Sequence, residues 1–429
     1  MELTRTQCYR VLETRDRRFD GRLFFGVTTT GIYCRPICPA RTPRPENVRY
    51  FPHAAAAECE GFRPCRRCRP ESAPDSPGWL GASWIVQRAL EMIGEGALDS
   101  KSVDALADDL GVGRRHLSRL FAREVGASPR AVARTRRLHF ARALIDQTEL
   151  RMIDVALGAG FSSVRRFNDA IRGAFGASPR ELRARALTAT TTPSFRLKLP
   201  YREPFEFDGL LDFLRRRAIP GVESVDHAEY RRIFESPDGP GELRVTNDAS
   251  ARCCVVELTR VDPRSIRDLQ RRVRSLFDLD ADPREIVACL GEDAALRTLV
   301  RNSPGLRVPG AWCGFEIAVR VILGQQVSVE AATTLAGRLV ATEGRRIDAA
   351  SRTLHTLFPT PARLAEADLT TIGIPRTRAR ALRELSRAVA EGGLDLERGD
   401  PWDVRRRLLE LPGVGPWTAE MVAMRALRD

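Results

Sequence analysis

The stretch Gly31-Ile32-Tyr33-Cys34-Arg35-Pro36-Ile37-Cys38-Pro39 carries two cysteines in a C-x3-C pattern. A C-x2-C pair follows one loop-sized segment later, in Phe62-Arg63-Pro64-Cys65-Arg66-Arg67-Cys68. Two close thiolate pairs at this spacing can converge on one tetrahedral Zn²⁺, so we expect a zinc ion held by all four cysteines. Arginines flank both pairs, and the same surface would attract the phosphates of a nucleic acid.

The cysteine quartet is open to two interpretations. A structural zinc site is the simpler one, because most four-cysteine clusters only hold a fold together. The alternative is a reactive site, because metal binding deprotonates a thiol and the thiolate is the nucleophilic form of cysteine. Four thiolates on one Zn²⁺ carry a net charge of about −2, which would keep electron density on sulfur.

Composition narrows the class of protein. The chain has 429 residues, 43% of them hydrophobic, and a net charge of +13, which predicts several domains and a polyanionic partner. Neither a long apolar run nor a signal region is present, so we expect a cytoplasmic protein with reduced cysteines. Outside the quartet we expect buried, small hydrophobic cysteines: Cys8, Cys59, Cys253, Cys254, Cys289 and Cys313.

Turn-rich segments predict the domain boundaries. Ser72–Gly78 and Thr188–Ser194 are linkers by composition, and a softer break lies near Asn302–Gly305. We therefore expect four domains, over residues 1–75, 79–187, 195–304 and 305–429.

The second of these domains contains an internal repeat. Phe121–Arg134 reads FAREVGASPRAVAR, and Ile171–Ala184 reads IRGAFGASPRELRA. Each copy predicts a short helix, a glycine turn and a second helix, which is the helix-turn-helix plan. In the second helices, the apolar residues Leu117, Leu120, Phe121, Val164 and Phe167 face inward and Ser162 or Ser163 caps the later helix. Polar side chains are left outside for DNA: Arg114, Arg115, His116, Arg119, Arg165, Arg166 and Asn168.

From Phe195 onward the pattern is mixed and then helical. Short strands are predicted at 231–234, 242–245 and 253–258, between helices at 207–217 and 266–276. After Gly305 we expect helices alone, at 313–325, 329–342, 361–367, 376–391, 403–410 and 417–427. Between the last two, Leu411-Pro412-Gly413-Val414-Gly415-Pro416-Trp417 predicts a helix-hairpin-helix. Gly413 and Gly415 would let the backbone approach a phosphate, and exposed hairpin carbonyls would suit a monovalent cation.

The N-terminal half resembles two known families. TTGIYCRPICPAR followed by GFRPCRRC is similar to the Ada family, whose zinc module repairs methyl phosphotriesters in DNA. The resemblance implies that Cys34 accepts the methyl group irreversibly and that Thr30, Arg41 and Arg67 contact the DNA backbone. The repeat, above all AxxxGFSSVRRFNDAIRGAFGASPRELR, is similar to AraC-type regulators. Methylation would turn one thiolate into a neutral thioether, so the cluster would repel DNA less and promoter affinity would rise.

The C-terminal half resembles AlkA-type 3-methyladenine DNA glycosylases of type II. The hairpin and the upstream segment Ala318–Ser328 carry this resemblance, which places Gln326 and Trp417 in the base pocket or as the wedge in DNA. Such enzymes flip a damaged base out of the helix and hydrolyse its glycosidic bond. The family's catalytic aspartate falls beyond Asp429, so we expect an incomplete glycosylase domain, most simply a truncated sequence, and little 3-methyladenine release. The Pro-Cys-His motif of O6-methylguanine transfer does not occur.

Together these expectations describe a multidomain α+β protein. It has a small four-cysteine zinc domain, an all-α double helix-turn-helix domain, a small α+β domain and an all-α helix-hairpin-helix glycosylase domain. An Ada–AlkA fusion of this kind would repair alkylated DNA and activate transcription at promoters, with RNA polymerase as a partner, in a bacterial cytoplasm at the nucleoid. Two alternatives stay open: a regulator with structural zinc and an inert glycosylase half, and a glycosylase with accessory DNA-binding domains.

Overall fold

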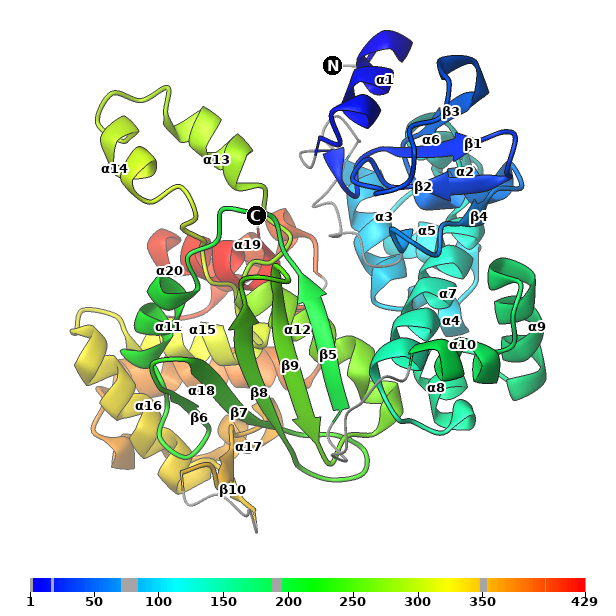
Figure 1. Cartoon of the computed structure of the whole chain (residues 1–429). Coiled ribbons are helices and arrows are strands. Elements are labelled where there is room, and N and C mark those ends of the chain that lie inside the picture. The colour runs from blue at the N-terminus through cyan, green and yellow to red at the C-terminus, as the bar shows by residue number, and fades with distance from the viewer. Residues whose placement is uncertain are drawn as a thin grey trace. The chain divides into compact units, whose positions relative to one another are not determined.

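A computed structural model of the chain describes residues 3–16, 19–70, 84–186, 195–347, 353–397 and 399–428 (Figure 1). The chain forms two compact units. The first consists of Met1–Pro200 with Pro263–Asp268, and the second of Tyr201–Asp262 with Leu269–Asp429. Within the described residues, no helix is both long enough and apolar enough to span a membrane.

The first unit opens with a small module built on a four-stranded sheet of order β3-β1-β2-β4. Strand β2 pairs in parallel with β4, with Tyr33 opposite Pro64, so that Cys34 and Cys65 follow at the same end of the sheet. The elements of this zinc module are α1 (Arg5–Glu13), β1 (Phe24–Val27), β2 (Ile32–Cys34), η2 (Pro45–Asn47), β3 (Val48–Phe51), α2 (Ala54–Cys59) and β4 (Arg63–Pro64).

Eight helices follow in the same unit and form the helix-turn-helix domain. The predicted repeat is present as two helix pairs, α5 with α6 and α8 with α9, and the long helix α7 joins them. Gly111 and Gly160 adopt positive φ in the turns within the two pairs, a conformation that favours glycine. The helices are α3 (Trp84–Gly94), α4 (Ala97–Ser100), α5 (Val103–Asp109), α6 (Arg114–Glu124), α7 (Pro129–Gln147), α8 (Met152–Gly158), α9 (Val164–Phe175) and α10 (Pro179–Ala186).

The inward-facing residues of the repeat are buried for the most part as predicted. Leu117, Phe121 and Phe167 are completely buried, and Leu120 is nearly so, whereas Val164 is only half-buried. Ser163 rather than Ser162 caps α9, because its side chain accepts a hydrogen bond from the backbone N–H of Arg166. Strand β5 (Phe195–Pro200) ends this part of the chain.

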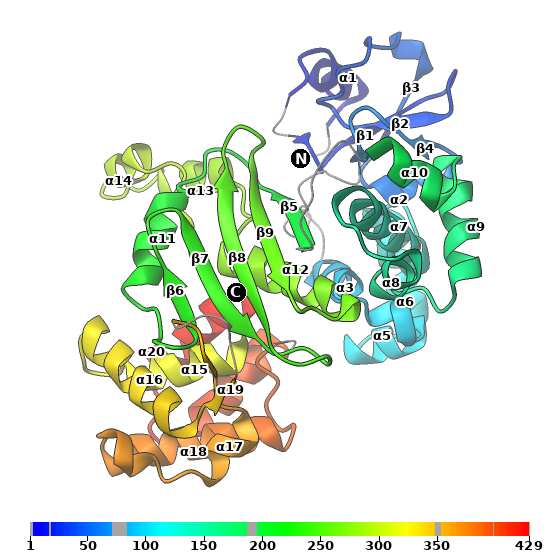
Figure 2. The ribbon, with the colours of Figure 1, turned by 60° about the horizontal axis from the view of Figure 1, so that its bottom comes forward.

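The second unit contains an antiparallel meander that Figure 2 views face on. Strands β6 (Glu223–Val225), β7 (Glu229–Phe234), β8 (Gly241–Asp248) and β9 (Cys253–Thr259) pair in sequence order. The three predicted strands are therefore present, and each is longer than its alternating pattern indicated. Aromatic rings form part of the core, where Phe277 stacks on Phe207 and meets Tyr230 edge to face. Helix α11 (Phe207–Arg215) belongs to the second unit, whereas η4 (Pro263–Ser265) and the first residues of α12 (Ile266–Leu276) belong to the first.

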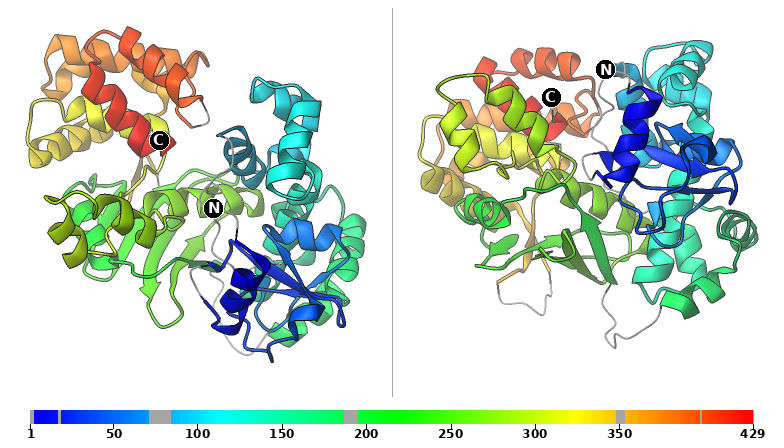
Figure 3. Two further views of the ribbon diagram at one scale, coloured as in Figure 1. Left: turned by 90° about the horizontal axis from the view of Figure 1, so that it is seen from above. Right: turned by 45° about the horizontal axis from the view of Figure 1, so that its top comes forward.

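The rest of the second unit is mainly helical (Figure 3), although the prediction that it contains helices alone was wrong. A short antiparallel pair, β10 (Arg345–Arg346) and β11 (Thr356–Leu357), interrupts it. Two-residue strands carry too little alternation to be recognised in a sequence. The helical elements are α13 (Pro283–Leu290), α14 (Arg297–Asn302), α15 (Gly314–Leu323), α16 (Val329–Glu343), α17 (Pro361–Glu366), η5 (Leu369–Ile372), α18 (Arg376–Ala390), α19 (Pro401–Glu410), α20 (Pro416–Val422) and the π-helical turn η6 (Ala423–Leu427).

The expected burial of the remaining cysteines is partly wrong. Cys8, Cys253 and Cys254 are buried and Cys313 is half-buried, but Cys59 and Cys289 are exposed. Cys59 is the last residue of the short helix α2, and Cys289 is the second-last residue of α13.

Candidate metal centre and nucleic-acid interfaces

The four predicted ligands meet in the zinc module. The sulfur atoms of Cys34, Cys38, Cys65 and Cys68 all lie within 4.8 Å of one another, and all four residues are buried. Cys34 ends β2 and Cys65 follows β4, so the parallel pairing of these strands brings the two cysteine pairs together. Leu12, Phe25 and Val48 pack around them, which makes the cluster part of the module's hydrophobic core.

The chemistry of the quartet fits a divalent cation. The pKa of the Cys34 thiol is raised, because it hydrogen-bonds to the sulfurs of Cys38, Cys65 and Cys68 and is largely desolvated. Four thiols packed so closely cannot all ionise on their own, since each thiolate would repel the next. A dication removes this conflict, and four sulfur ligands form the set that zinc takes in structural sites.

Backbone amides distinguish Cys34 from the other three ligands. The N–H of Arg35 donates to Sγ of Cys68 at 3.4 Å. The neighbouring sulfurs, Cys34 first, lower the pKa values of Cys38 and Cys65, and backbone hydrogen bonds from Ala40 and from the peptide of Cys68 lower them further. Among the contacts of the described residues, no such backbone hydrogen bond to Cys34 Sγ is found.

A buried ion pair supports the same loop. The guanidinium of Arg35 binds both carboxylate oxygens of Asp20, and its Nη1 donates to the carbonyl of Cys68 at 3.0 Å. Both side chains are about nine-tenths buried. The pair therefore holds Cys34 and Cys68 in register from behind the sulfur cluster, as partners outside the ligand set do in metal sites.

The residues predicted to contact DNA lie on the surface of the first unit. In the zinc module, Thr30, Arg41 and Arg67 are exposed, and Thr30 lies in the β1–β2 turn. On α6, Arg114, Arg115, His116 and Arg119 are exposed, and Arg114 pairs with Asp104 at 3.2 Å. On α9, Arg165 and Arg166 are exposed and Asn168 is half-buried.

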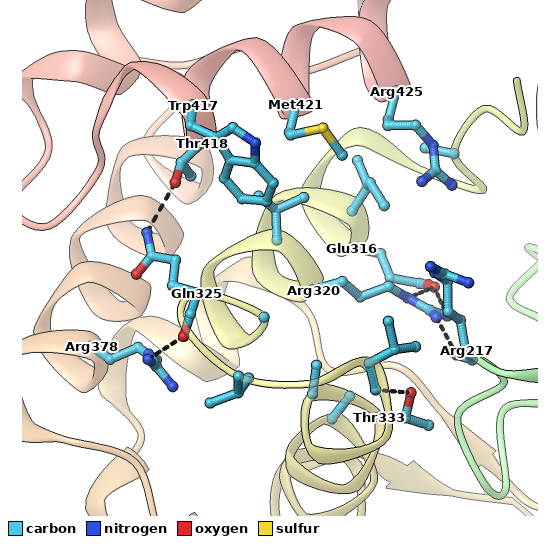
Figure 4. A pocket seen from close by; sticks show the side chains of 18 of the residues that line it. Arg217, Glu316, Arg320, Gln325, Thr333, Arg378, Trp417, Thr418, Met421 and Arg425 are labelled. Carbon is cyan, nitrogen blue, oxygen red and sulfur yellow. Dashed lines mark hydrogen bonds and ion pairs between the residues drawn. The ribbon is translucent and has the colours of Figure 1, made fainter.

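The second unit contains a large pocket with a volume of about 930 Å³ (Figure 4). Both predicted pocket residues, Gln326 and Trp417, line it, and Trp417 is 61% exposed. Gln326 is also exposed and adopts a φ of 56°, which is strained for a residue with a side chain. This strained turn joins α15 to α16 and presents Gln326 at the rim of the pocket.

Sequence reasoning missed the cationic wall of this pocket. The guanidinium of Arg217 stacks at 3.7 Å on the ring of Phe213, and that of Arg425 lies 5.3 Å from the same ring. Burial and the charges of Arg217 and Arg320 lower the pKa of Arg425 to about 10. Arg217 follows α11 and Arg425 lies in η6, and these elements are far apart in the sequence. No local sequence pattern could therefore have indicated this pair of arginines.

A buried ionic cluster forms the floor of the pocket. Arg232 binds Glu316 and Glu223, and Arg320 binds the same two carboxylates. Desolvation raises the pKa of Glu316, but Arg232 and Arg320 outweigh it and hold that pKa at about 2. The cluster ties strand β7 to helix α15 and so fixes two walls of the pocket.

The hairpin stands beside the pocket rim. Gly413 has a φ of 79° and, like Gly415, is exposed. Nε2 of Gln325 donates to the carbonyl of Gly413 and to Oγ1 of Thr418, both at 3.0 Å, while Arg378 donates to the Gln325 carbonyl. The hairpin and the turn that carries Gln326 are thus held against each other. The family's catalytic aspartate is expected beyond Asp429, and Asp429 itself lies outside the described residues.

Four family descriptions match the chain. Residues 7–71 match the metal binding domain of Ada, and residues 106–185 match a helix-turn-helix domain. Residues 196–313 match the AlkA N-terminal domain, and residues 319–424 match the HhH-GPD superfamily of base excision DNA repair proteins. A metal-binding module, a DNA-binding domain and a glycosylase fold therefore follow one another along the chain.

Relatives of known name match either the whole chain or one half of it. DNA-3-methyladenine glycosylase 2 of Escherichia coli is 35% identical over 53% of this chain and 79% of its own. The bifunctional transcriptional activator/DNA repair enzyme Ada of the same species is 36% identical over 37% of this chain and 43% of its own. A probable bifunctional transcriptional activator/DNA repair enzyme AlkA of Mycobacterium tuberculosis is 45% identical over 99% of this chain and 86% of its own. The chain belongs to this family of fused Ada–AlkA proteins.

Proposed function

We propose that the first unit removes methyl groups from DNA phosphotriesters onto Cys34 and regulates transcription, and that the second unit excises alkylated bases. The single observation that carries the first half is the buried cysteine quartet, whose four sulfur atoms lie within 4.8 Å of one another. Cys34, Cys38, Cys65 and Cys68 would hold Zn²⁺, which keeps thiolates deprotonated when bound.

The proposed transfer is a nucleophilic displacement at carbon. The thiolate of Cys34 attacks the methyl carbon, an S–C bond forms, and the C–O bond to phosphorus breaks. The electron pair leaves with the oxygen, so the DNA product is an ordinary phosphodiester anion. Amide hydrogen bonds draw electron density from the other three sulfurs, which directs the methyl group to Cys34.

The same transfer would act as a signal. Because Cys34 becomes a neutral thioether, the cluster loses one negative charge and repels the phosphate backbone less. Exposed arginines near the quartet, Arg41 and Arg67, would then bind DNA more tightly. The recognition helices α6 and α9 would supply sequence preference through Arg115, Arg119 and Arg165.

Replacement of Cys34 by serine tests this assignment. DNA that carries labelled methyl phosphotriesters should label the unchanged chain once and should not label the C34S variant, as measured by intact-protein mass spectrometry. A matched control is C59S, which removes an exposed cysteine of the same module and should keep full uptake. Equal methylation of C34S, or uptake lost in C59S, would overturn the assignment.

For the second unit, the pocket of about 930 Å³ that Trp417 and Gln326 line supports a base-excision role. Trp417 would stack on a flipped base, and Gly413 and Gly415 would hold the flanking phosphate through backbone amides. A monovalent cation would bind the hairpin carbonyls. Hydrolysis would further need a carboxylate directed at the sugar, whereas binding needs only the pocket and the hairpin.

The pocket assignment is therefore tested by binding. Base–aromatic stacking contributes roughly 1–3 kcal/mol per base, so W417A should weaken binding of DNA that carries an alkylated base about tenfold or more. W402A is the matched control, because Trp402 is 82% exposed on α19 and does not line the pocket. Fluorescence anisotropy measures both, and equal affinity for W417A and W402A would contradict the proposal.

The remaining features of the proposal follow from the domain order. We place the domains at 1–75, 79–187, 195–304 and 305–429, and RNA polymerase as the partner in activation. A cytoplasmic location at the nucleoid fits a DNA-binding chain of net charge +13. The opposing candidate, a regulator with structural zinc and an inert second unit, predicts no methyl uptake in the Cys34 experiment.

A further inference from the structure

Each copy of the repeat ends its second helix in a turn of sequence Gly-Ala-Ser-Pro, at Gly126–Pro129 and at Gly176–Pro179. Both of these GASP turns contact the zinc module, which the helix-turn-helix plan does not require. Gly126 and Gly176 each follow the second helix of a pair, and both adopt positive φ. A Cβ at Gly126 would lie 3.2 Å from Cβ of Ala56 in the zinc module. A Cβ at Gly176 would lie 3.5 Å from Nη2 of Arg66, also in the zinc module. Both equivalent turns thus touch the same neighbour.

Helix α2 packs closely against the helix-turn-helix domain. Its four alanines, Ala54–Ala57, are all buried. Ala55 is completely buried and belongs to the same hydrophobic cluster as Val86, Leu117 and Phe121 of the helix-turn-helix domain. Alanine side chains allow close approach of two helices, so this zinc-module helix completes the core of the neighbouring domain.

A polar bridge lies at the centre of the contact. Glu58 of α2 accepts hydrogen bonds from Tyr33 at 2.9 Å and from Thr135 of α7 at 2.5 Å. The Tyr33 hydroxyl also lies 3.0 Å from Nε2 of His139 on α7, and that nitrogen lies 3.4 Å from the Glu58 carboxylate. The side chains of Glu58 and His139 are less than one-fifth exposed. Buried groups with mutual partners specify one arrangement, because any other leaves them unsatisfied.

The second turn is held by arginines that follow β4. Nη2 of Arg66 donates to the carbonyl of Phe175, the last residue of α9, at 2.7 Å. Arg69 pairs at 3.1 Å with Asp146 of α7, whose side chain is 4% exposed and is also bound by Arg142. The carbonyl at a helix C-terminus is a favourable partner for a cation.

We propose that α7 and the two GASP turns form a docking surface for the zinc module, which makes both modules one rigid DNA-binding body. The repeat of the turns then has a second purpose besides ending α6 and α9. Because Tyr33 immediately precedes Cys34 on β2, the strand that carries the proposed methyl acceptor is itself anchored to α7. Docking, rather than the connecting segment 71–83, sets the spacing between the methylated phosphate and the sequence read by α6 and α9.

The docking is tested without DNA. A protease site is introduced into the segment 71–83 of the full, zinc-loaded chain, which is cleaved and then passed over a sizing column at micromolar concentration. The two halves should elute together. E58A should raise the dissociation constant of the two halves at least tenfold, because Tyr33, Thr135 and His139 lose their shared partner. The constant is measured by repeating the column run at successive dilutions. The matched control E60A removes a neighbouring carboxylate that pairs with Arg49 of the same module, and it should change association less than twofold.

Separation of the unchanged halves, or equal weakening by E58A and E60A, would overturn the docking proposal. The spacing consequence, which rests on the proposed DNA-binding function, has its own test. Duplexes are selected from a random pool with the unchanged chain, and hydroxyl-radical footprints are compared after six Gly/Ser residues are added to segment 71–83. Footprints of equal length support fixed spacing, and a longer footprint contradicts it. Selection of no duplex would refute the DNA-binding function while the column result still decides the docking.

Discussion

At the scale of single residues, the charge on Glu316 is maintained against its burial. Arg232 and Arg320 hold its pKa at about 2, although the residue is only 3% exposed. Since this folded pKa lies below the usual glutamate pKa of about 4.5, the ionised group stabilises the fold above about pH 4.5. That contribution is lost as the pH falls from about 4.5 toward 2, at up to about 1.4 kcal/mol per pH unit.

E316Q should therefore flatten the acid dependence and also destabilise the second unit at neutral pH. Removal of one partner from a buried pair leaves two arginines under-compensated, which costs about 3–5 kcal/mol. Urea unfolding at pH 7 and pH 4 measures both effects. E384Q is the control, since Glu384 pairs with Arg387 on the exposed side of α18 and should cost less than about 1 kcal/mol. An unchanged slope in E316Q would contradict the linkage.

The site residues that could be predicted from the sequence are those that belong to a short local motif. The cysteine quartet has ligand spacing, and Gly413 and Trp417 belong to a hairpin with its own local pattern. Arg217, Arg425 and Glu316 could not be predicted, because only the packing of α11, α15 and η6 brings them to one cavity. Arginine is so frequent in this chain that no single one is conspicuous.

At the scale of elements, the two repeats differ in how their recognition helices begin. Ser163 caps α9 with its side chain, whereas Gly113 at the same position of α6 offers no side-chain hydrogen bond. Gly113 has an extended backbone, with φ −74° and ψ 143°, and a Cβ there would meet no atom within 4 Å. The site is therefore compatible with a capping side chain.

The two caps predict opposite effects of substitution. S163A should lower the free energy of unfolding by about 1 kcal/mol, because an N–H of α9 loses its acceptor. G113S should raise it by a few tenths of a kcal/mol, since serine can fill the empty cap without strain. Urea titration followed by circular dichroism compares both with the unchanged chain. Destabilisation by G113S would show that the glycine is needed for a reason other than capping.

Helices were predictable wherever apolar residues recur at helical spacing over several turns, as in α6, α9, α16 and α18. Strands β7 to β9 were found but underestimated in length, because pairing with neighbours extends a strand beyond its alternating residues. The β10–β11 pair was missed because backbone pairing of two-residue strands, not a side-chain pattern, creates it.

At the scale of the whole molecule, the two compact units have separate sources of stability. The quartet is part of the core of the zinc module, and that module supplies Ala55 to the core of the helix-turn-helix domain. The second unit has its own apolar cluster around α15, α16 and α18, together with the Glu316 ion cluster. A single unfolding temperature would therefore not describe the chain.

Calorimetry should resolve two transitions that respond to different changes. A strong chelator should lower the transition of the first unit, because the free energy of binding a four-cysteine metal site is part of the free energy of folding. It should leave the second transition in place, because the described part of the second unit contains no comparable cluster of ligands. E316Q should lower the transition of the second unit and leave that of the first unit in place. E58A should lower only the transition of the first unit, since Glu58 connects the metal-binding module to α7. A chelator that shifts both transitions equally would show that the units unfold as one cooperative body.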